Sequence, residues 1–217
     1  MINFLKQLLD FIYKQQCYIC KKTKENTLLC SECYKHLLQE EANHSLEVGI
    51  KEGVPYYHAG FYAKNMQKLI RGIKYHNQRA FAQYLAKFVN EYWKKFEASK
   101  QYYTIIPVPM YEAKQKKRHY NHMDLIAQEF AKLTNYTIET NLIKRIKDTK
   151  PQYGLNKLER KENLKDAFAV NDIKINHPKL LIFDDILTTG STVNEMIKTL
   201  KGNGYLDITV LTITSIR

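Results

Sequence analysis

Short apolar runs alternate with amphipathic segments along most of the chain, and this alternation indicates a layered α/β fold. Residues 180–183 are apolar without interruption, as a strand buried on both faces should be. Other segments space their apolar residues for one helical face, as between Met123 and Leu133. The pattern predicts strands at 56–62, 102–109, 142–146, 179–183 and 206–216, and helices at 65–74, 79–96, 123–133 and 192–200. Strands that alternate with helices favour a mainly parallel sheet flanked by helices.

The first 45 residues differ from the rest of the chain in pattern and composition. The opening segment, MINFLKQLLDFIYKQ, places apolar residues along one helical face, and the cysteines follow it. Residues 46–217 carry the alternation of strands and helices. We therefore expect an N-terminal helix with a small cysteine domain over residues 1–45 and an α/β domain over residues 46–217.

The cysteines Cys17, Cys20, Cys30 and Cys33 form two CxxC pairs separated by nine residues. Two such pairs are typical of a structural zinc site with four thiolate ligands. Two disulfides are disfavoured in a reducing compartment, and a redox dithiol normally needs only one CxxC. We expect bound zinc to fold this segment, because so short a segment has almost no apolar core of its own.

The net charge is +12, from 34 Lys and Arg against 22 Asp and Glu, which should attract polyanions. A generally Lys-rich, solvated surface without a partner is the alternative. No apolar run approaches the ~20 residues of a transmembrane helix. The N-terminus lacks a signal-peptide pattern, so we expect a cytoplasmic protein.

An acidic pair and a hydroxyl-rich turn follow the apolar run at 179–183. Asp184 and Asp185 come at its carboxyl end, where open α/β sheets bind ligands. The turn then provides hydroxyls around a flexible glycine at a helix start, which favours a bound phosphate. Its residues are Thr188, Thr189, Gly190, Ser191 and Thr192. An ordinary helix cap would explain one hydroxyl, whereas the acids suit ribose hydroxyls or a Mg²⁺ ion that bridges to a diphosphate.

This block resembles the phosphoribosyl pyrophosphate motif of the type I phosphoribosyltransferases: an apolar strand, two acids and a Thr-Thr-Gly loop. The resemblance implies that Asp184 and Asp185 contact the ribose hydroxyls and that residues 188–192 bind the 5-phosphate. It also implies that Mg²⁺ binds together with phosphoribosyl pyrophosphate.

A basic segment from Lys114 to His119 lies between a predicted strand and a predicted helix. We expect a flexible loop at the same sheet edge as Asp184. In phosphoribosyltransferases the loop after an early strand binds pyrophosphate, and this resemblance assigns Lys117, Arg118 and Asn121 to that role. A solvated run of charge is the alternative. The nearby His119 and His122 are expected to be loop residues without a specific role, with proton transfer or phosphate binding as the alternative.

Several segments together resemble the ComF family of competence proteins, which take up single-stranded DNA during natural transformation. They occur in the family order: the cysteine pairs, Gly60 and Ile73-Lys74, Pro107-Val108-Pro109, Arg118 to His122, a spaced run of Gln152, Leu155, Arg160, Asn163, Leu164 and Phe168, and LLIFDDILTTGST. In the family the fourth segment usually reads Arg-Gly-Phe-Asn-Gln, so His119 replaces a glycine.

Membership would imply a type I phosphoribosyltransferase fold, phosphoribosyl pyrophosphate with Mg²⁺, and a role in DNA uptake. Other uptake proteins would be its partners and would place it at the inner membrane. Tyrosines beside cations, such as Tyr75, Tyr111 and Tyr120, add a signal for single-stranded DNA. No residue identifies an acceptor nucleophile, so catalysis is left open. A nucleobase-salvage phosphoribosyltransferase and a DNA-binding module with a vestigial sugar-phosphate site are the alternatives.

Overall fold

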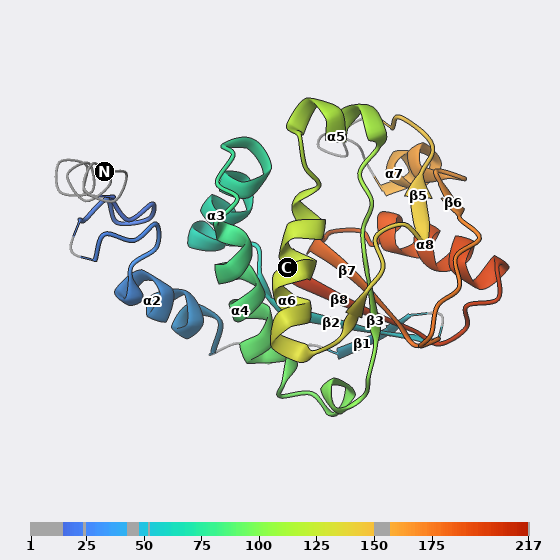
Figure 1. The fold of residues 1–217 in the computed structure, drawn as a ribbon, viewed down its shortest axis with the longest axis horizontal. Helices are drawn as coiled ribbons and strands as arrows, with labels where there is room; N and C mark the ends of the chain where they lie inside the picture. The colour runs from blue at the N-terminus through green and yellow to red at the C-terminus, as the bar shows by residue number, and fades with distance from the viewer. Residues whose placement is uncertain (1–14, 24, 43–47, 52, 150–156, 217) are drawn as a thin grey trace, which may run out of the picture.

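The computed structural model describes residues 15–23, 25–42, 48–51, 53–149 and 157–216 (Figure 1). Its centre is a six-stranded sheet in the order β1-β2-β8-β7-β3-β4, in which β1 is antiparallel to β2 and all other neighbours are parallel. The strands are β1 (Val48–Lys51), β2 (Val54–Phe61), β3 (Thr104–Pro107), β4 (Thr137–Ile138), β7 (Leu180–Leu187) and β8 (Ile208–Ser215). The predicted mainly parallel sheet is confirmed, and the more specific phosphoribosyltransferase fold stays a prediction.

Helices cover both faces of this sheet because successive side chains of a strand point to opposite faces. Leu181 and Phe183 of β7 pack with α3, α4 and α6, whereas Leu180 and Ile182 pack with α7 and α8 on the other face. The helices are α2 (Ser31–Ala42), α3 (Lys64–Tyr75), α4 (Phe81–Trp93), α5 (Glu112–Arg118), α6 (His122–Thr134), α7 (Lys157–Leu164) and α8 (Ser191–Gly202), with a short 3-10 helix η1 (Glu97–Lys100). Within the described residues, no helix is long and apolar enough to cross a membrane.

A second sheet of two antiparallel strands, β5 (Ile143–Arg145) and β6 (Phe168–Val170), lies on the α8 side. Ile143 and Phe168 are buried in the same apolar cluster as Leu180 and Ile182. This two-stranded sheet therefore lies beside β7, next to the edge where the chain turns into α8 (Figure 1).

The cysteine segment packs against the helical face of the α/β part. Cys17, Leu29 and Cys30 are buried in one apolar cluster with Leu69 of α3 and Phe81 of α4. The hydroxyl of Tyr92 in α4 also donates a hydrogen bond to the carbonyl of Leu38 in α2, at 2.7 Å. The two parts of the chain thus share a core, although their sequence patterns differ.

Three predicted elements differ from the structure in ways that concern the site. β7 continues to Leu187, so Asp184 and Asp185 lie within the strand and not after its end. The prediction of a flexible basic loop is wrong, because residues 112–118 form the helix α5. Its Lys, Gln and Arg residues favour helix, and Glu112 pairs with Lys116 one turn on at 2.5 Å.

The third difference is β1, which forms the outer edge of the sheet and was not predicted from the sequence. Two further predictions lie outside the described residues. They are the N-terminal helix over residues 1–14 and the part of the family run that contains Gln152 and Leu155.

Candidate sugar-phosphate site

β7 outruns its neighbour β3 at the carboxyl edge of the sheet. Pairing between these strands ends at Pro107 and Phe183, whereas β7 stays paired with β8 as far as Leu187 and Ser215. Residues 184–187 therefore have a strand on one side only. The sheet opens at this point, as parallel sheets do where they bind ligands.

The turn from Thr188 to Gly190 connects β7 to α8, and its geometry suits an anion. Gly190 has a left-handed backbone (φ 74°), which a glycine adopts without strain. It occupies the position before the helix and makes no side-chain hydrogen bond to cap it. The Thr189 and Ser191 hydroxyls lie 2.8 Å apart, beside the backbone N–H groups of the first turn.

A cavity of about 450 Å³ opens beside this turn. The predicted residues Asp184, Asp185, Thr188, Thr192 and Asn121 line it. Thr189 and Gly190 line an adjoining hollow of about 200 Å³, together with Tyr56 and β1. The cavity lining also contains apolar and aromatic side chains, namely Tyr62, Tyr75, Val108, Met110, Met123, Ile186 and Ile216.

The two aspartates face opposite sides of the sheet, and this separates their chemistry. Continuing the alternation of β7, Asp185 points to the α3 and α6 side, where one of its oxygens contacts Lys74 Nζ and His122 Nε2, each at 2.5 Å. Burial by itself raises the pKa of a carboxyl group, but Lys74 and His122 outweigh it and hold the pKa of Asp185 below its usual range. Asp185 is therefore an ionised, internally bound carboxylate.

Asp184 lies on the side of α8 and the two-stranded β5–β6 sheet. Burial, and then the negative charge of Asp185, raise the pKa of Asp184 to about 7, against the opposing effect of Lys74 and Arg145. Within the described part of the chain, its side chain accepts a hydrogen bond from the backbone N–H of Asp185, at 2.9 Å. Asp184 is thus the acid of the pair that a ligand or a cation can engage.

His122 is not a loop residue without a role, as the sequence had suggested. It begins α6, is buried, and donates from Nε2 to Asp185. Its other ring nitrogen, Nδ1, lies 3.2 Å from Arg118 Nη1, which can only donate. Burial lowers the pKa of His122, so the two contacts fit a neutral ring with its proton on Nε2.

The two cations that line the cavity are Lys74, at the end of α3, and Arg145, on β5. Arg145 Nε is buried and has no hydrogen-bond partner in the described part of the chain, while its Nη2 contacts Thr149. Neither cation was assigned to the site from the sequence. Lys74 stood within a family motif. Arg145 carried no local signal, because it reaches the cavity from β5, which is distant in sequence from Asp184.

The residues assigned to pyrophosphate lie differently. Lys117 is exposed on α5 and, like Arg118, is not part of the cavity lining. Asn121 lines the cavity but also caps α6, because its side chain accepts from Met123 N–H at 3.1 Å and donates to the Val108 carbonyl. Its position follows from helix capping as much as from any ligand.

His119 takes over the backbone role of the glycine that it replaces. It ends α5 with a left-handed conformation (φ 65°, ψ 4°), which non-glycine residues adopt at a cost. The turn between α5 and α6 is therefore kept in spite of the substitution.

The four cysteines form a second candidate site. Their sulfur atoms all lie within 4.8 Å of one another, close enough to hold a metal ion. A tetrahedral zinc site with Zn–S bonds of about 2.3 Å needs sulfurs about 3.8 Å apart, so the donor set fits zinc. Burial raises the pKa of Cys17 but backbone N–H groups lower it further, to about 6, which favours a thiolate ligand.

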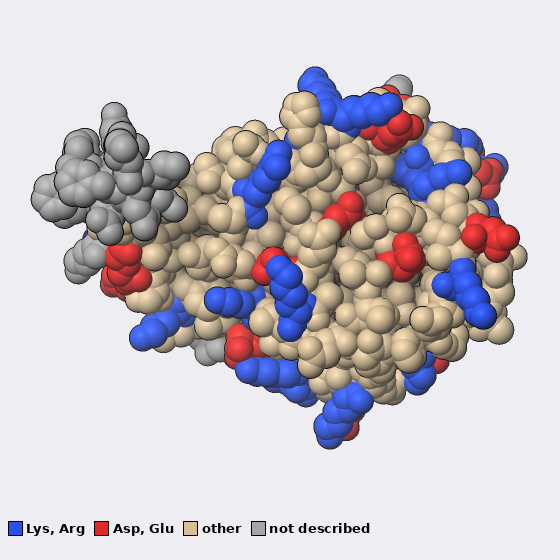
Figure 2. Space-filling view, in the orientation of Figure 1, with Lys and Arg blue, Asp and Glu red and all other residues tan. Residues whose placement is uncertain are grey.

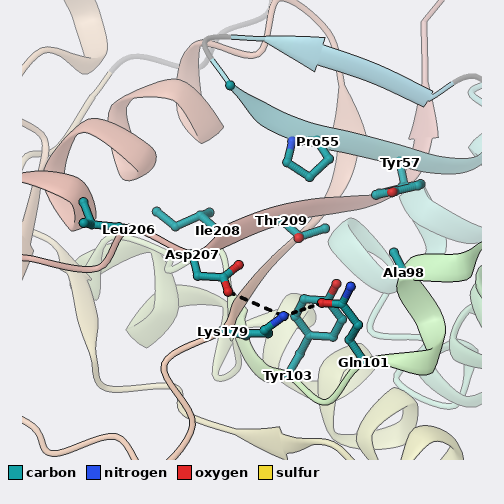
Figure 3. Close-up of a pocket in the computed structure, with 11 residues that line it drawn as sticks. Pro55, Tyr57, Ala98, Gln101, Tyr103, Lys179, Leu206, Asp207, Ile208 and Thr209 are labelled. Carbon is teal, nitrogen blue, oxygen red and sulfur yellow. Dashed lines mark hydrogen bonds and ion pairs between the residues drawn. The ribbon is translucent and has the colours of Figure 1, made fainter.

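A cavity of about 330 Å³ lies at the opposite, amino edge of the sheet (Figure 3). Lys179 reaches across it to Gln101 Oε1 at 2.6 Å and to Asp207 Oδ2 at 3.6 Å, so these polar groups already satisfy one another. This cavity has no phosphate-binding turn. It offers matched control positions for the site at the carboxyl edge.

Comparisons with known proteins were made on the whole chain. Competence protein F of Haemophilus influenzae is 36% identical over 157 residues, which cover 70% of this chain and 68% of that protein. The DNA utilization proteins YhgH of Salmonella typhimurium and of Escherichia coli K12 are 33% and 31% identical over 106 residues. Those matches cover 49% of this chain and 46% of each relative, so they span about half of the YhgH proteins. No protein-family model matches the chain.

Proposed function

The chain belongs to the family of competence protein F, the ComF family, and on this premise we propose that it supports DNA uptake in the cytoplasm during natural transformation. It binds phosphoribosyl pyrophosphate with Mg²⁺ at the carboxyl edge of the sheet, and it binds single-stranded DNA. The names of the relatives, competence protein and DNA utilization protein, support the role in DNA handling. Other proteins of DNA uptake would hold it at the inner membrane.

One observation carries the ligand assignment: a helix start with a left-handed glycine, a hydroxyl-rich turn and an available acid meet beside one cavity. In this proposal, residues 188–192 bind the 5-phosphate through hydroxyl and backbone N–H groups. Asp184 accepts from the ribose hydroxyls, and Asp185 fixes Lys74 and His122 beside it. Lys74 and Arg145 are the cations placed to meet the pyrophosphate.

The residues present also fit Mg²⁺. This ion commonly takes one or two carboxylates and completes its shell with substrate phosphates and water. Asp184 offers such a carboxylate, whereas Lys74 and His122 occupy Asp185. Bound Mg²⁺ would neutralise the diphosphate and stabilise it as a leaving group.

A second candidate function, transfer of the phosphoribosyl group to a nucleobase, is favoured by the apolar half of the cavity. Tyr62, Met110 and Ile216 lie there, and a planar base could pack against them. This candidate predicts release of pyrophosphate when a base is added. Among the residues that the structure describes, no side chain has the role of an acceptor base, so ligand binding is the primary proposal.

The cysteine cluster is proposed to hold zinc in a structural role. All four ligand positions are filled by thiols, which leaves no open position for a substrate. Purified protein should contain about one equivalent of zinc, and folded protein with far less would contradict this assignment.

Thermal melting with phosphoribosyl pyrophosphate tests the ligand site. We expect an increase in Tm that requires Mg²⁺ and is lost in Asp184→Asn, because ligands that bind only the folded state stabilise it. Asp207→Asn, at the opposite edge of the sheet, is the matched control and should respond as the wild type does. Equal stabilisation of the wild type and Asp184→Asn would refute the site.

Transformation frequency then tests the biological role. A strain that carries Asp184→Asn should transform as poorly as a deletion strain, while Asp207→Asn should restore normal transformation. Normal transformation by Asp184→Asn would show that DNA uptake does not depend on this cavity.

A further inference from the structure

Three cation–aromatic pairs lie between the cysteine cluster and the carboxyl-edge cavity. Lys21 Nζ is 4.8 Å from the centre of the Tyr18 ring, and Arg79 Cζ is 4.5 Å from the centre of the Tyr120 ring. Arg118 Cζ is 5.4 Å from the centre of the Tyr75 ring. We call this set the stacked ridge. Its members are Tyr18, Lys21, Tyr75, Arg79, Arg118 and Tyr120.

The pairs are connected to one another through the end of α3 and the turn that follows it. The Tyr18 hydroxyl is hydrogen-bonded to Nδ1 of His76 at 2.7 Å, and Tyr120 donates to the Ile73 carbonyl at 2.5 Å. Tyr75 itself lines the cavity. In Figure 1 the turn between α3 and α4 lies between the cysteine segment and α5, so the ridge leads from the cysteines to the cavity rim.

Two features of the ridge exceed what packing needs. Tyr75 is 68% exposed, although Arg118 lies against its ring, so packing covers little of this residue. Within the described residues, Lys21, Arg79 and Arg118 form no ion pair with a carboxylate, whereas many other lysines do. Tyr120, by contrast, is 7% exposed and serves packing.

Net charge alone would not have located this surface. Figure 2 shows Lys and Arg side chains dispersed over the visible face, with acidic side chains among them. Cations that lie against aromatic rings, close to the exposed Tyr75, mark the ridge, and not the density of charge.

We propose that single-stranded DNA lies along the stacked ridge, with one base stacked on Tyr75 and its phosphates on Lys21, Arg79 and Arg118. This rests on the proposed function, and it adds where the strand lies and how it is held. Sequence-tolerant binding of single strands combines cations that follow the backbone with aromatic rings on which bases stack. Stacking on Tyr75 requires an unpaired base, which favours a single strand over a duplex.

The strand then ends at, or passes, the rim of the sugar-phosphate cavity. Arg118, which lies on Tyr75, also donates toward His122, and His122 holds Asp185. A strand on the ridge therefore contacts the same network that shapes the ligand site.

Fluorescence anisotropy with a labelled oligothymidine, measured over a range of salt, tests the ridge. Tyr75→Ala should weaken binding about tenfold, from the 1–3 kcal/mol of one stacked base, without changing the salt dependence. Arg79→Gln/Arg118→Gln should weaken binding and reduce the slope of log affinity against log salt by about 1.4, which is 0.7 for each phosphate contact on a single strand.

Lys87→Gln/Lys174→Gln is the charge-matched control, since both lysines are exposed, form no ion pair within the described residues and do not belong to the ridge. Losses in this control that equal those of the arginine variant would show general attraction of polyanions and overturn the ridge. Binding of a duplex as tight as that of the single strand, or weakened equally by Tyr75→Ala, would overturn the stacking mode.

Failure of the ridge can be told apart from failure of the proposed function. If the wild type binds no single-stranded DNA, the DNA part of the proposed function fails along with the ridge. If it binds DNA and the ridge variants do so equally well, only the ridge fails. Arg79→Gln, which lies outside the cavity lining, should keep the Mg²⁺-dependent stabilisation by phosphoribosyl pyrophosphate.

Discussion

Asp184 and Asp185 are adjacent in the sequence but differ in environment, because β7 sends them to opposite faces of the sheet. Asp185 is held by Lys74 and His122, while Asp184 has burial and a like charge beside it. The sequence assigned both acids to the ribose. The structure separates a carboxylate that organises the site from one that a ligand can reach.

The raised pKa of Asp184, about 7 against an unfolded value of about 4, predicts a pH-dependent stability. Between these values the unfolded chain has lost the proton that the folded protein keeps, so this group destabilises the fold increasingly as pH rises from about 4 to about 7. Asp184→Asn removes the effect. The free energy of unfolding of the variant, relative to the wild type, should rise by on the order of 3 kcal/mol across that window, measured by urea denaturation. A constant difference would contradict the shifted pKa.

Removing Lys74 should expose the cost of the charge on Asp185. Lys74→Met leaves a buried carboxylate without its cation, and breaking such a pair typically costs about 3 kcal/mol or more. Lys74→Met/Asp185→Asn should recover most of the loss, because no unpaired charge then remains. Urea denaturation of the two single variants and the double variant gives the coupling, and additive losses would show that the pair is not coupled.

The protein should be more stable with glycine at position 119, the residue that the family usually has there. His119→Gly relieves the left-handed backbone and should raise the free energy of unfolding by about 0.5–1 kcal/mol. Asn135 ends α6 with a similar backbone (φ 58°), but Asn tolerates it better, so Asn135→Gly is the control and should gain less. A loss of stability in His119→Gly would contradict this account.

Residues of the site were predictable where their chemistry was local in the sequence. The acid pair and the hydroxyl-rich turn are contiguous, so their meaning could be inferred before any contact was known. Lys74, His122 and Arg145 could not be placed in this way. They reach Asp185 and Asp184 from α3, α6 and β5, and such contacts depend on how distant elements pack.

At the scale of elements, α3 joins the cysteine cluster to the sugar-phosphate site. Gly72 packs against Phe81 and Tyr18 on one side of α3, and Lys74 reaches Asp185 two residues later. A Cβ at position 72 would lie 2.5 Å from a Phe81 ring carbon, so this close approach needs glycine. The cysteine segment therefore supports the helix that carries Lys74.

Removal of the metal should destabilise the α/β part as well as the cysteine segment. Cys17 and Cys30 are buried in the cluster that contains Leu69 and Phe81, so unfolding of the cysteine segment exposes that core. Calorimetry after chelation should show a lower main Tm and a smaller increase on adding phosphoribosyl pyrophosphate with Mg²⁺. An unchanged main transition would mean that the cysteine domain folds independently.

The types of most elements could be predicted from periodicity, but the end of β7 and the helix α5 could not. The buried runs of β7 and β8 and the apolar faces of α3, α4 and α6 were recognisable in the sequence. The strand β7 was predicted too short, because Asp184 and Asp185 end the apolar run. In the structure, β8 continues to pair with β7 beyond them. The basic segment was taken for a loop because its helix buries no apolar face.

At the scale of the whole molecule, two surfaces meet at one rim. The cavity at the carboxyl edge has the features of a sugar-phosphate site, and the stacked ridge leads from the cysteines to Tyr75 at its border. The amino edge has a cavity too, but there Lys179, Gln101 and Asp207 satisfy one another. The molecule is thus asymmetric, with its proposed binding functions at one edge of the sheet.

Calorimetric titration of phosphoribosyl pyrophosphate into the zinc-loaded protein tests the central claim most directly. We predict one saturable site per chain that requires Mg²⁺. Ribose 5-phosphate and pyrophosphate should each bind to it more weakly. Asp184→Asn should abolish the binding, whereas Asp207→Asn should retain it. No saturable binding by the wild type, or equal binding by Asp184→Asn, would contradict the assignment of this edge as a sugar-phosphate site.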